Sequence, residues 1–174
     1  MRLVSIVALS MLLTISGAAC AHDEPLDKLP PAERDTWIEL GSRVHGGFGS
    51  LIALGIRIGY DALHVLNARP REVDVTYYSG EKAPCPCVVD GILVATSASP
   101  GQNSLRVASE PAGPEEFGRA VIRHKKTGAT VEYSIPMSAG PVFRDLNKLP
   151  VVARWDGIMK AQEQTIFVRT ERKP

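Results

Sequence analysis

SLIALGIRIGYDALHVLN, residues 50–67, predicts a long apolar helix around which the rest of the domain can pack. Its apolar side chains recur at helical spacing, from Leu51 to Leu66. Gly55 and Gly59 lie four residues apart on one face, which indicates close approach by another backbone. Arg57 and Asp61 are also four apart and could pair on a polar face. These charges argue against a membrane-spanning helix.

The segments around this helix predict a single α+β domain over residues 32–170 with a mixed or antiparallel sheet. A short helix is expected from Pro31 to about Ser42, followed by a Gly-rich loop, residues 45–50. Strands are expected at residues 72–78 and 104–109, and a hairpin at 120–123 and 130–135. Residues 87–97 fit a helix or a buried strand, and residues 99–103 a turn. One or two short helices should follow Pro141, and then a last strand at 165–169.

The N-terminus has the pattern of a cleavable signal peptide, residues 1–21. Arg2 precedes an uncharged apolar run, and Ala19-Cys20-Ala21 fits the small-residue cleavage rule. We therefore expect cleavage after Ala21, a flexible leader at residues 22–31, and a periplasmic or secreted protein without an integral membrane segment. The alternative is a lipoprotein anchored at Cys20, although Gly17 stands where such signals usually carry a large aliphatic residue.

Charge and length narrow the class of the mature protein. The chain has 174 residues, with 20 Lys and Arg against 19 Asp and Glu. Arg2 is the single charged residue of the signal, so the mature domain is formally neutral. A neutral chain has no electrostatic attraction for nucleic acid, and we expect none as a partner. The length suits one domain with a real core.

Two cysteines and a histidine could carry chemistry. Cys85-Pro86-Cys87 could supply thiolates to a metal, close a disulfide, or remain buried thiols, and the spacing leaves these three alternatives open. No second C-x-C or C-x-x-C exists, which excludes a self-contained zinc ribbon. His45 heads the Gly-rich loop, where a ligand could approach the backbone or where the ring could simply bond locally.

A hydroxyl-rich stretch, residues 96–103, could line a polar pocket or form an ordinary surface turn. The sequence contains no G-x-S-x-G elbow, no P-loop and no dinucleotide fingerprint. No catalytic residues and no reaction are therefore assigned from motifs, and the natural ligand is not defined.

Three motifs together resemble the FmdE-like domain family, which takes its name from formylmethanofuran dehydrogenase. His45-Gly-Gly-Phe-Gly-Ser-Leu-Ile-Ala-Leu-Gly-Ile-Arg-Ile-Gly59 is similar to that family's H-G-H-x-(C/G)-P-x-x-x-x-G-x-R-x-G. Cys87-Val-Val-Asp-Gly-Ile92 is similar to C-x-x-D-G/A-I. Thr96-Ser-Ala-Ser-Pro-Gly-Gln-Asn-Ser-Leu105 is similar to T-G-C-T-x-G-K-G-N-L. The resemblance implies an α+β fold, commonly a homodimer, in which motif His and Cys side chains converge on a metal, often zinc.

The chain departs from the family pattern at several ligand positions. His45 and Cys87 are retained, and Asp90 also matches, as a group supporting the site. Gly47 stands in place of the second His, and Ala98 in place of the Cys of T-G-C-T. Zinc at catalytic sites takes at least three protein ligands, so Cys85 would have to supply the replacement.

Three functional hypotheses remain. The first is a metal site, for zinc or another divalent transition metal, built on His45, Cys85 and Cys87. The second is a metal-free domain that binds a small ligand or a partner. The third is a thiol–disulfide redox role for Cys85 and Cys87. The pocket expected under the second hypothesis is lined by Gly46, Gly47, Arg57, Asp90, Thr96 and Ser99.

Overall fold

The fold is seen in a computed structural model that describes residues 34–172. Its sheet has five strands in the order β2-β1-β3-β4-β5. They are β1 (Val73–Ser79), β2 (Leu105–Val107), β3 (Glu116–His124), β4 (Thr130–Pro136) and β5 (Val168–Arg172). β1 and β2 are parallel, whereas the other neighbours are antiparallel. The mixed sheet of a single α+β domain is thus confirmed.

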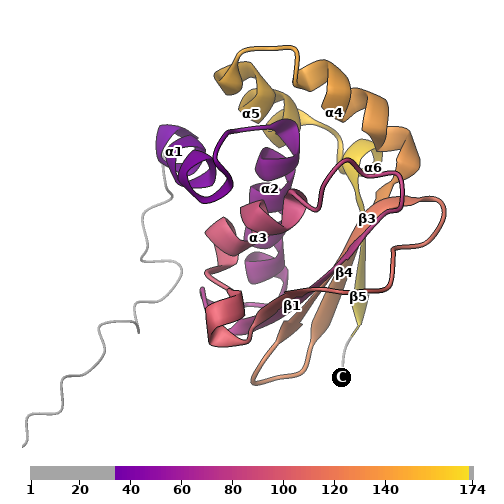
Figure 1. Ribbon diagram of the computed structural model, residues 1–174. Coiled ribbons are helices and arrows are strands. Elements are labelled where there is room, and N and C mark those ends of the chain that lie inside the picture. Colours follow the sequence, from indigo (N-terminus) through magenta and orange to yellow (C-terminus); the bar gives the residue numbers. More distant parts are fainter. Residues whose placement is uncertain (1–33, 173–174) are drawn as a thin grey trace, which may run out of the picture.

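Helices cover one side of this sheet (Figure 1). They are α1 (Arg34–His45), α2 (Ser50–Val65), α3 (Val88–Thr96), α4 (Gly140–Leu146), α5 (Val151–Lys160) and α6 (Glu163–Ile166), with 3₁₀ turns at Pro100–Gln102 and Met137–Ala139. α2 is buried almost all round, including Leu54, Ile58 and Ala62. It therefore forms the centre of the core, as its apolar sequence predicts.

Glycines bring α2 and α3 into backbone contact. A Cβ placed on Gly55 would lie 2.9 Å from the Cα of Gly91, and it would collide with the carbonyl oxygen of Val88. One turn later, a Cβ on Gly59 would lie 2.8 Å from the Cβ of Ala95. The expected close approach at Gly55 and Gly59 is confirmed, and α3 is the element that makes it.

The sheet buries one face by simple alternation. Val73, Val75 and Tyr77 of β1 point into the core, and so do Val131 and Tyr133 of β4. This period of two is the pattern of a half-buried strand. β5 differs, because it is an edge strand whose five residues are all exposed.

Several predicted element boundaries are wrong. The first helix continues past Ser42 to His45, so His45 ends a helix instead of heading the loop. Residues 163–166 form α6, and the last strand begins at Val168 instead of 165. Residues 88–96 are helical, which decides between the two alternatives for that segment. The turn at 99–103 is confirmed as a 3₁₀ turn.

The possible Arg57–Asp61 ion pair is not formed. Asp61 instead accepts hydrogen bonds from Tyr133 and from Arg169. Arg57 donates to the carbonyl oxygens of Ile158 (2.6 Å) and Ala161 (2.9 Å) at the end of α5. Each side chain meets a partner from another element, and such contacts outweigh the few tenths of a kcal/mol that a helical i,i+4 pair offers.

The signal peptide, Cys20 and the leader at residues 22–31 lie outside the described residues. Within residues 34–172, no helix is both long and apolar enough to cross a membrane.

Candidate functional site

A histidine–carboxylate pair joins the end of α1 to the first turn of α3. His45 Nδ1 lies 2.7 Å from Asp90 Oδ2, and about a third of each side chain is exposed (32% and 33%). A carboxylate can only accept, so this hydrogen bond is donated by Nδ1, and a neutral ring in this tautomer has its free lone pair on Nε2. Metal-binding histidines are oriented by carboxylates in this way. The contact joins residues from two of the three sequence motifs.

The two cysteines lie directly before this first turn. Cys85 and Cys87 are joined in a disulfide with their Cα atoms 5.3 Å apart. Cys87 is the N-cap of α3, and its carbonyl oxygen accepts the N–H of Asp90 (3.2 Å). Both cysteines are half-buried. The disulfide holds both sulfurs, so in this form neither Cys85 nor Cys87 has a thiolate to offer a metal.

The loop at residues 46–49 is open around its glycines. Gly46 has φ +85°, a conformation that favours glycine. A Cβ on Gly47 would meet nothing within 4 Å. The loop leads into α2, whose first N–H, on Ser50, donates to Asn147 Oδ1 (2.8 Å). A larger side chain therefore has room at Gly47, the position where the family motif has its second histidine.

The hydroxyl-rich stretch after α3 is engaged within itself. The buried Thr96 hydroxyl donates to the carbonyl oxygen of Ile92 (2.7 Å) and accepts the N–H of Ala98 (3.2 Å). The Ser99 N–H donates to Ser104 Oγ (3.1 Å). Ala98 itself is fully buried. These groups shape the turn.

Arg57 lies apart from the other expected pocket residues. It lines a groove of about 430 Å³ between α1, α2 and α5, together with Trp37, Tyr60 and Trp155. None of the other five predicted pocket residues is among those that line this groove. The structure therefore brings His45 into contact with Asp90, three residues after Cys87, and it places Arg57 in a groove that none of these residues lines.

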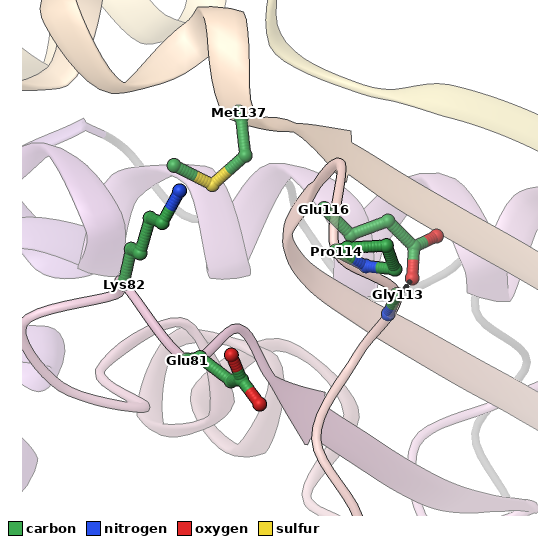
Figure 2. Close-up of a pocket in the computed structure, with 6 residues that line it drawn as sticks. All are labelled: Glu81, Lys82, Gly113, Pro114, Glu116 and Met137. Carbon is green, nitrogen blue, oxygen red and sulfur yellow. Dashed lines mark hydrogen bonds between the residues drawn. The ribbon is translucent and has the colours of Figure 1, made fainter.

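A second, smaller cavity lies just beyond the C-terminal end of β1 (Figure 2). Its volume is about 90 Å³, and Glu81, Lys82 and Met137 line it with Glu116. The Glu116 carboxylate accepts the Gly113 N–H (2.8 Å) and the Ser134 hydroxyl (2.7 Å). Figure 2 shows this carboxylate turned toward Gly113 and away from Lys82. We assign no binding role to this cavity.

Residues from distant parts of the chain support the candidate site and were missed from the sequence. Asn147, which follows Ser50 by 97 residues in the sequence, caps α2 by accepting the Ser50 N–H. The Ser50 hydroxyl donates to the carbonyl oxygen of Phe143 (3.1 Å). Arg154 donates to the carbonyl oxygen of Phe48 (2.7 Å) in the Gly-rich loop. No local sequence pattern predicts such contacts. Within residues 34–172, no group of three or more His, Cys, Asp or Glu side chains is arranged to hold a metal ion.

The fold and this site define the class of the protein. It is an α+β domain whose helices cover one side of a mixed sheet, with a His–Asp pair and a C-x-C pair at the start of α3. The family model described as "FmdE, Molybdenum formylmethanofuran dehydrogenase operon" matches residues 44–168. The chain belongs to the FmdE family, as its three motifs predict. A search among curated proteins finds no match to the chain.

Proposed function

We propose that this FmdE-family protein is exported and binds a transition metal such as zinc through His45, Cys85 and Cys87. The observation that supports this proposal best is the 2.7 Å contact between His45 and Asp90. This contact ties His45 to Asp90, which lies in the first turn of α3, three residues after Cys87. Formylmethanofuran chemistry is not part of the proposal, because membership of a family does not transfer its reaction.

The donor set suits a metal in one redox state of the cysteines. In the disulfide form the two sulfurs are bonded to each other, and zinc needs more protein ligands than His45 alone. Reduction would release two thiolates directly before α3, the helix whose Asp90 contacts His45. One imidazole and two thiolates make three protein ligands, the usual number at open zinc sites. We therefore propose that the dithiol form binds the metal.

A zinc titration tests this proposal. Mature protein, residues 22–174, is titrated in competition with a chromophoric chelator, once reduced and once oxidised. The reduced protein should bind one equivalent of zinc, and the oxidised protein at least about 100-fold more weakly. His45→Ala and Cys87→Ser should each lower the affinity of the reduced form about 100-fold or more. Asp90→Asn should lower it about 10–100-fold, because it removes the group that orients a ligand.

The matched control is His64→Ala, which removes an exposed histidine on α2 that contacts Tyr60. This variant should bind zinc as the wild type does. Stoichiometric zinc that survives both His45→Ala and Cys87→Ser would show that the proposed ligands are wrong. Gly47→His adds a gain-of-function arm, since the open space at Gly47 should let a fourth protein ligand tighten binding.

The Cys85–Cys87 disulfide favours a second candidate function, a metal-free domain that binds a small ligand or a partner. Mature protein that takes up no zinc in either redox state, and that is two hydrogen masses lighter than the dithiol form, would support it. A redox role for the same pair is the third candidate. It predicts a reduction potential well above the roughly −300 mV below which inert structural disulfides lie.

A further inference from the structure

A groove on the helical side of the molecule has the composition of a ligand site. It lies between α1, α2 and α5 and measures about 430 Å³, within the range of small-molecule pockets. Trp37, Tyr60 and Trp155 supply flat aromatic surface, and Met159 supplies an adaptable apolar one. Such walls suit a ligand with a flat apolar body.

The two ionic side chains on α2 that line this groove differ in their partners. The Asp61 carboxylate is neutralised, because it accepts the Tyr133 hydroxyl (2.6 Å) and the Arg169 guanidinium (2.9 Å). Arg57 has no carboxylate partner within residues 34–172. Its hydrogen bonds both leave from Nη1 and go to main-chain carbonyls of α5. These bonds, and the Phe167 ring whose centroid lies 5.5 Å from the guanidinium carbon, hold the group in place, and within residues 34–172 neither Nε nor Nη2 donates a hydrogen bond.

We propose that this groove binds a small organic anion with a flat apolar body, such as an aromatic carboxylate or sulfonate. The ring would pack against Trp37, Tyr60 and Trp155, and the anionic group would meet the Arg57 guanidinium. Planar guanidinium groups favour carboxylates and related oxyanions. The inference is independent of the proposed metal site, because His45, Asp90 and the two cysteines are not among the residues that line the groove.

Both tryptophans of the chain line the groove, so intrinsic fluorescence reports directly on its occupancy. The first experiment titrates mature wild-type protein with three probes: anilinonaphthalene sulfonate, its uncharged analogue N-phenylnaphthylamine, and the cation benzyltrimethylammonium. The sulfonate should bind one-to-one and quench tryptophan emission by energy transfer. It should bind at least about tenfold more tightly than the uncharged analogue. A tenfold difference in affinity corresponds to about 1.4 kcal/mol, and a hydrogen bond to a charged group contributes at least that much. The cation should bind most weakly.

Substitutions at Arg57 then test the source of that preference. Arg57→Gln should lower the affinity for the sulfonate about tenfold and leave that for N-phenylnaphthylamine unchanged, while Arg57→Lys should fall in between. Arg106→Gln is the control, because Arg106 is an exposed arginine on β2 and does not line the groove. That variant should keep the wild-type affinities. The single-tryptophan variants Trp37→Phe and Trp155→Phe should both still be quenched.

Any of three results would overturn the proposal. One is equal affinity for the sulfonate and the uncharged analogue in the wild type, a comparison that needs no variant to fold. Another is tighter binding of the cation, which would make the groove an aromatic cage for ammonium groups. The last is sulfonate binding that does not quench tryptophan emission, which would place the probe elsewhere. Zinc binding by the reduced protein is measured separately, so failure here leaves the metal proposal standing.

Discussion

Two buried tyrosines show how one hydroxyl can help and another hinder folding. Tyr77 and Tyr133 are both fully buried against the helices. The Tyr133 hydroxyl donates to Asp61 at 2.6 Å, whereas within residues 34–172 no group bonds the Tyr77 hydroxyl. A buried polar group without a partner loses its hydration and gains nothing in return. The same residue type therefore has opposite energetic consequences on two strands of one sheet.

We predict that Tyr77→Phe leaves the free energy of unfolding unchanged or raises it by about 1 kcal/mol, and that Tyr133→Phe lowers it by about 1.5 kcal/mol or more. The first substitution removes an unpaired hydroxyl, and the second removes a hydrogen bond to a charged carboxylate. Urea unfolding at neutral pH measures both. A loss of stability in Tyr77→Phe as large as that in Tyr133→Phe would contradict the contrast.

The same two residues set the response to alkali. Burial raises the pKa of Tyr77 and of Tyr133 above the ordinary value, and for Tyr133 the nearby Asp61 raises it further. The folded state therefore holds these protons more tightly than the unfolded state. Stability from this source is intact below about pH 10 and falls above it, by about 1.4 kcal/mol per pH unit for each tyrosine. Each phenylalanine variant should flatten that slope, and Tyr60→Phe, at an exposed ring, is the control.

At the scale of elements, the crossing of α2 and α3 decides where the candidate site lies. Gly55 and Gly91 let the two backbones touch, with a Cβ on Gly91 falling 2.8 Å from the Cα of Gly55. This contact fixes α3 against the first half of α2. Asp90 lies in the same part of α3, so the glycine contact also fixes Asp90 beside His45.

Gly91→Ala should therefore destabilise the protein by about 1–3 kcal/mol, even though alanine favours helices, because its methyl group would collide with main-chain atoms of α2. Gly157→Ala is the matched helical control. Its methyl group would meet side-chain atoms of Leu146, which can move, so the loss should be smaller. Thermal unfolding of both variants gives the comparison. Equal losses would mean that the α2–α3 contact is not specially tight.

The sequence predicted the elements better than their partners. Helical periodicity identified α2, alternation and turn residues identified the β3–β4 hairpin, and the glycine pair predicted close packing. Each of these signals is local. Packing the apolar faces into one core then requires the elements to be compatible with one another. The partners of Arg57 and Asp61 come from α5, β4 and β5, and so they lie beyond any local pattern.

The candidate site was also predicted only in part, because contacts between distant parts of the chain have no local pattern. The motifs named His45, Cys87 and Asp90, and the structure brings His45 and Asp90 into contact. The motifs also placed Arg57 in the same pocket, yet Arg57 projects from α2 toward α5. The groove was missed, because Trp37 and Trp155 are far apart in the chain and meet through the packing of α1 and α5.

At the scale of the whole molecule, the proposal of export gives a prediction about the mature N-terminus. When the full chain is expressed in a Gram-negative bacterium, the protein should appear in the periplasmic fraction. Its mass should be that of residues 22–174, because Ala21 ends the small-residue cleavage motif. Ala21→Asp should block this cleavage, and Cys20→Ala should not change the location. Membrane-bound protein carrying acyl chains, released by Cys20→Ala, would support the lipoprotein alternative instead.

The exposed edge strand β5 has a consequence for behaviour at high concentration. Unpaired main-chain groups along an edge can recruit the edge of another molecule and start β-aggregation. In β5, Arg169, Glu171 and Arg172 place charges along this edge, and the opposite edge strand, β2, has three residues. Neutralising these charges, with glutamine at all three positions, would turn the edge into a template for self-association. The charged residues of β5 are therefore expected to oppose edge-to-edge pairing between molecules.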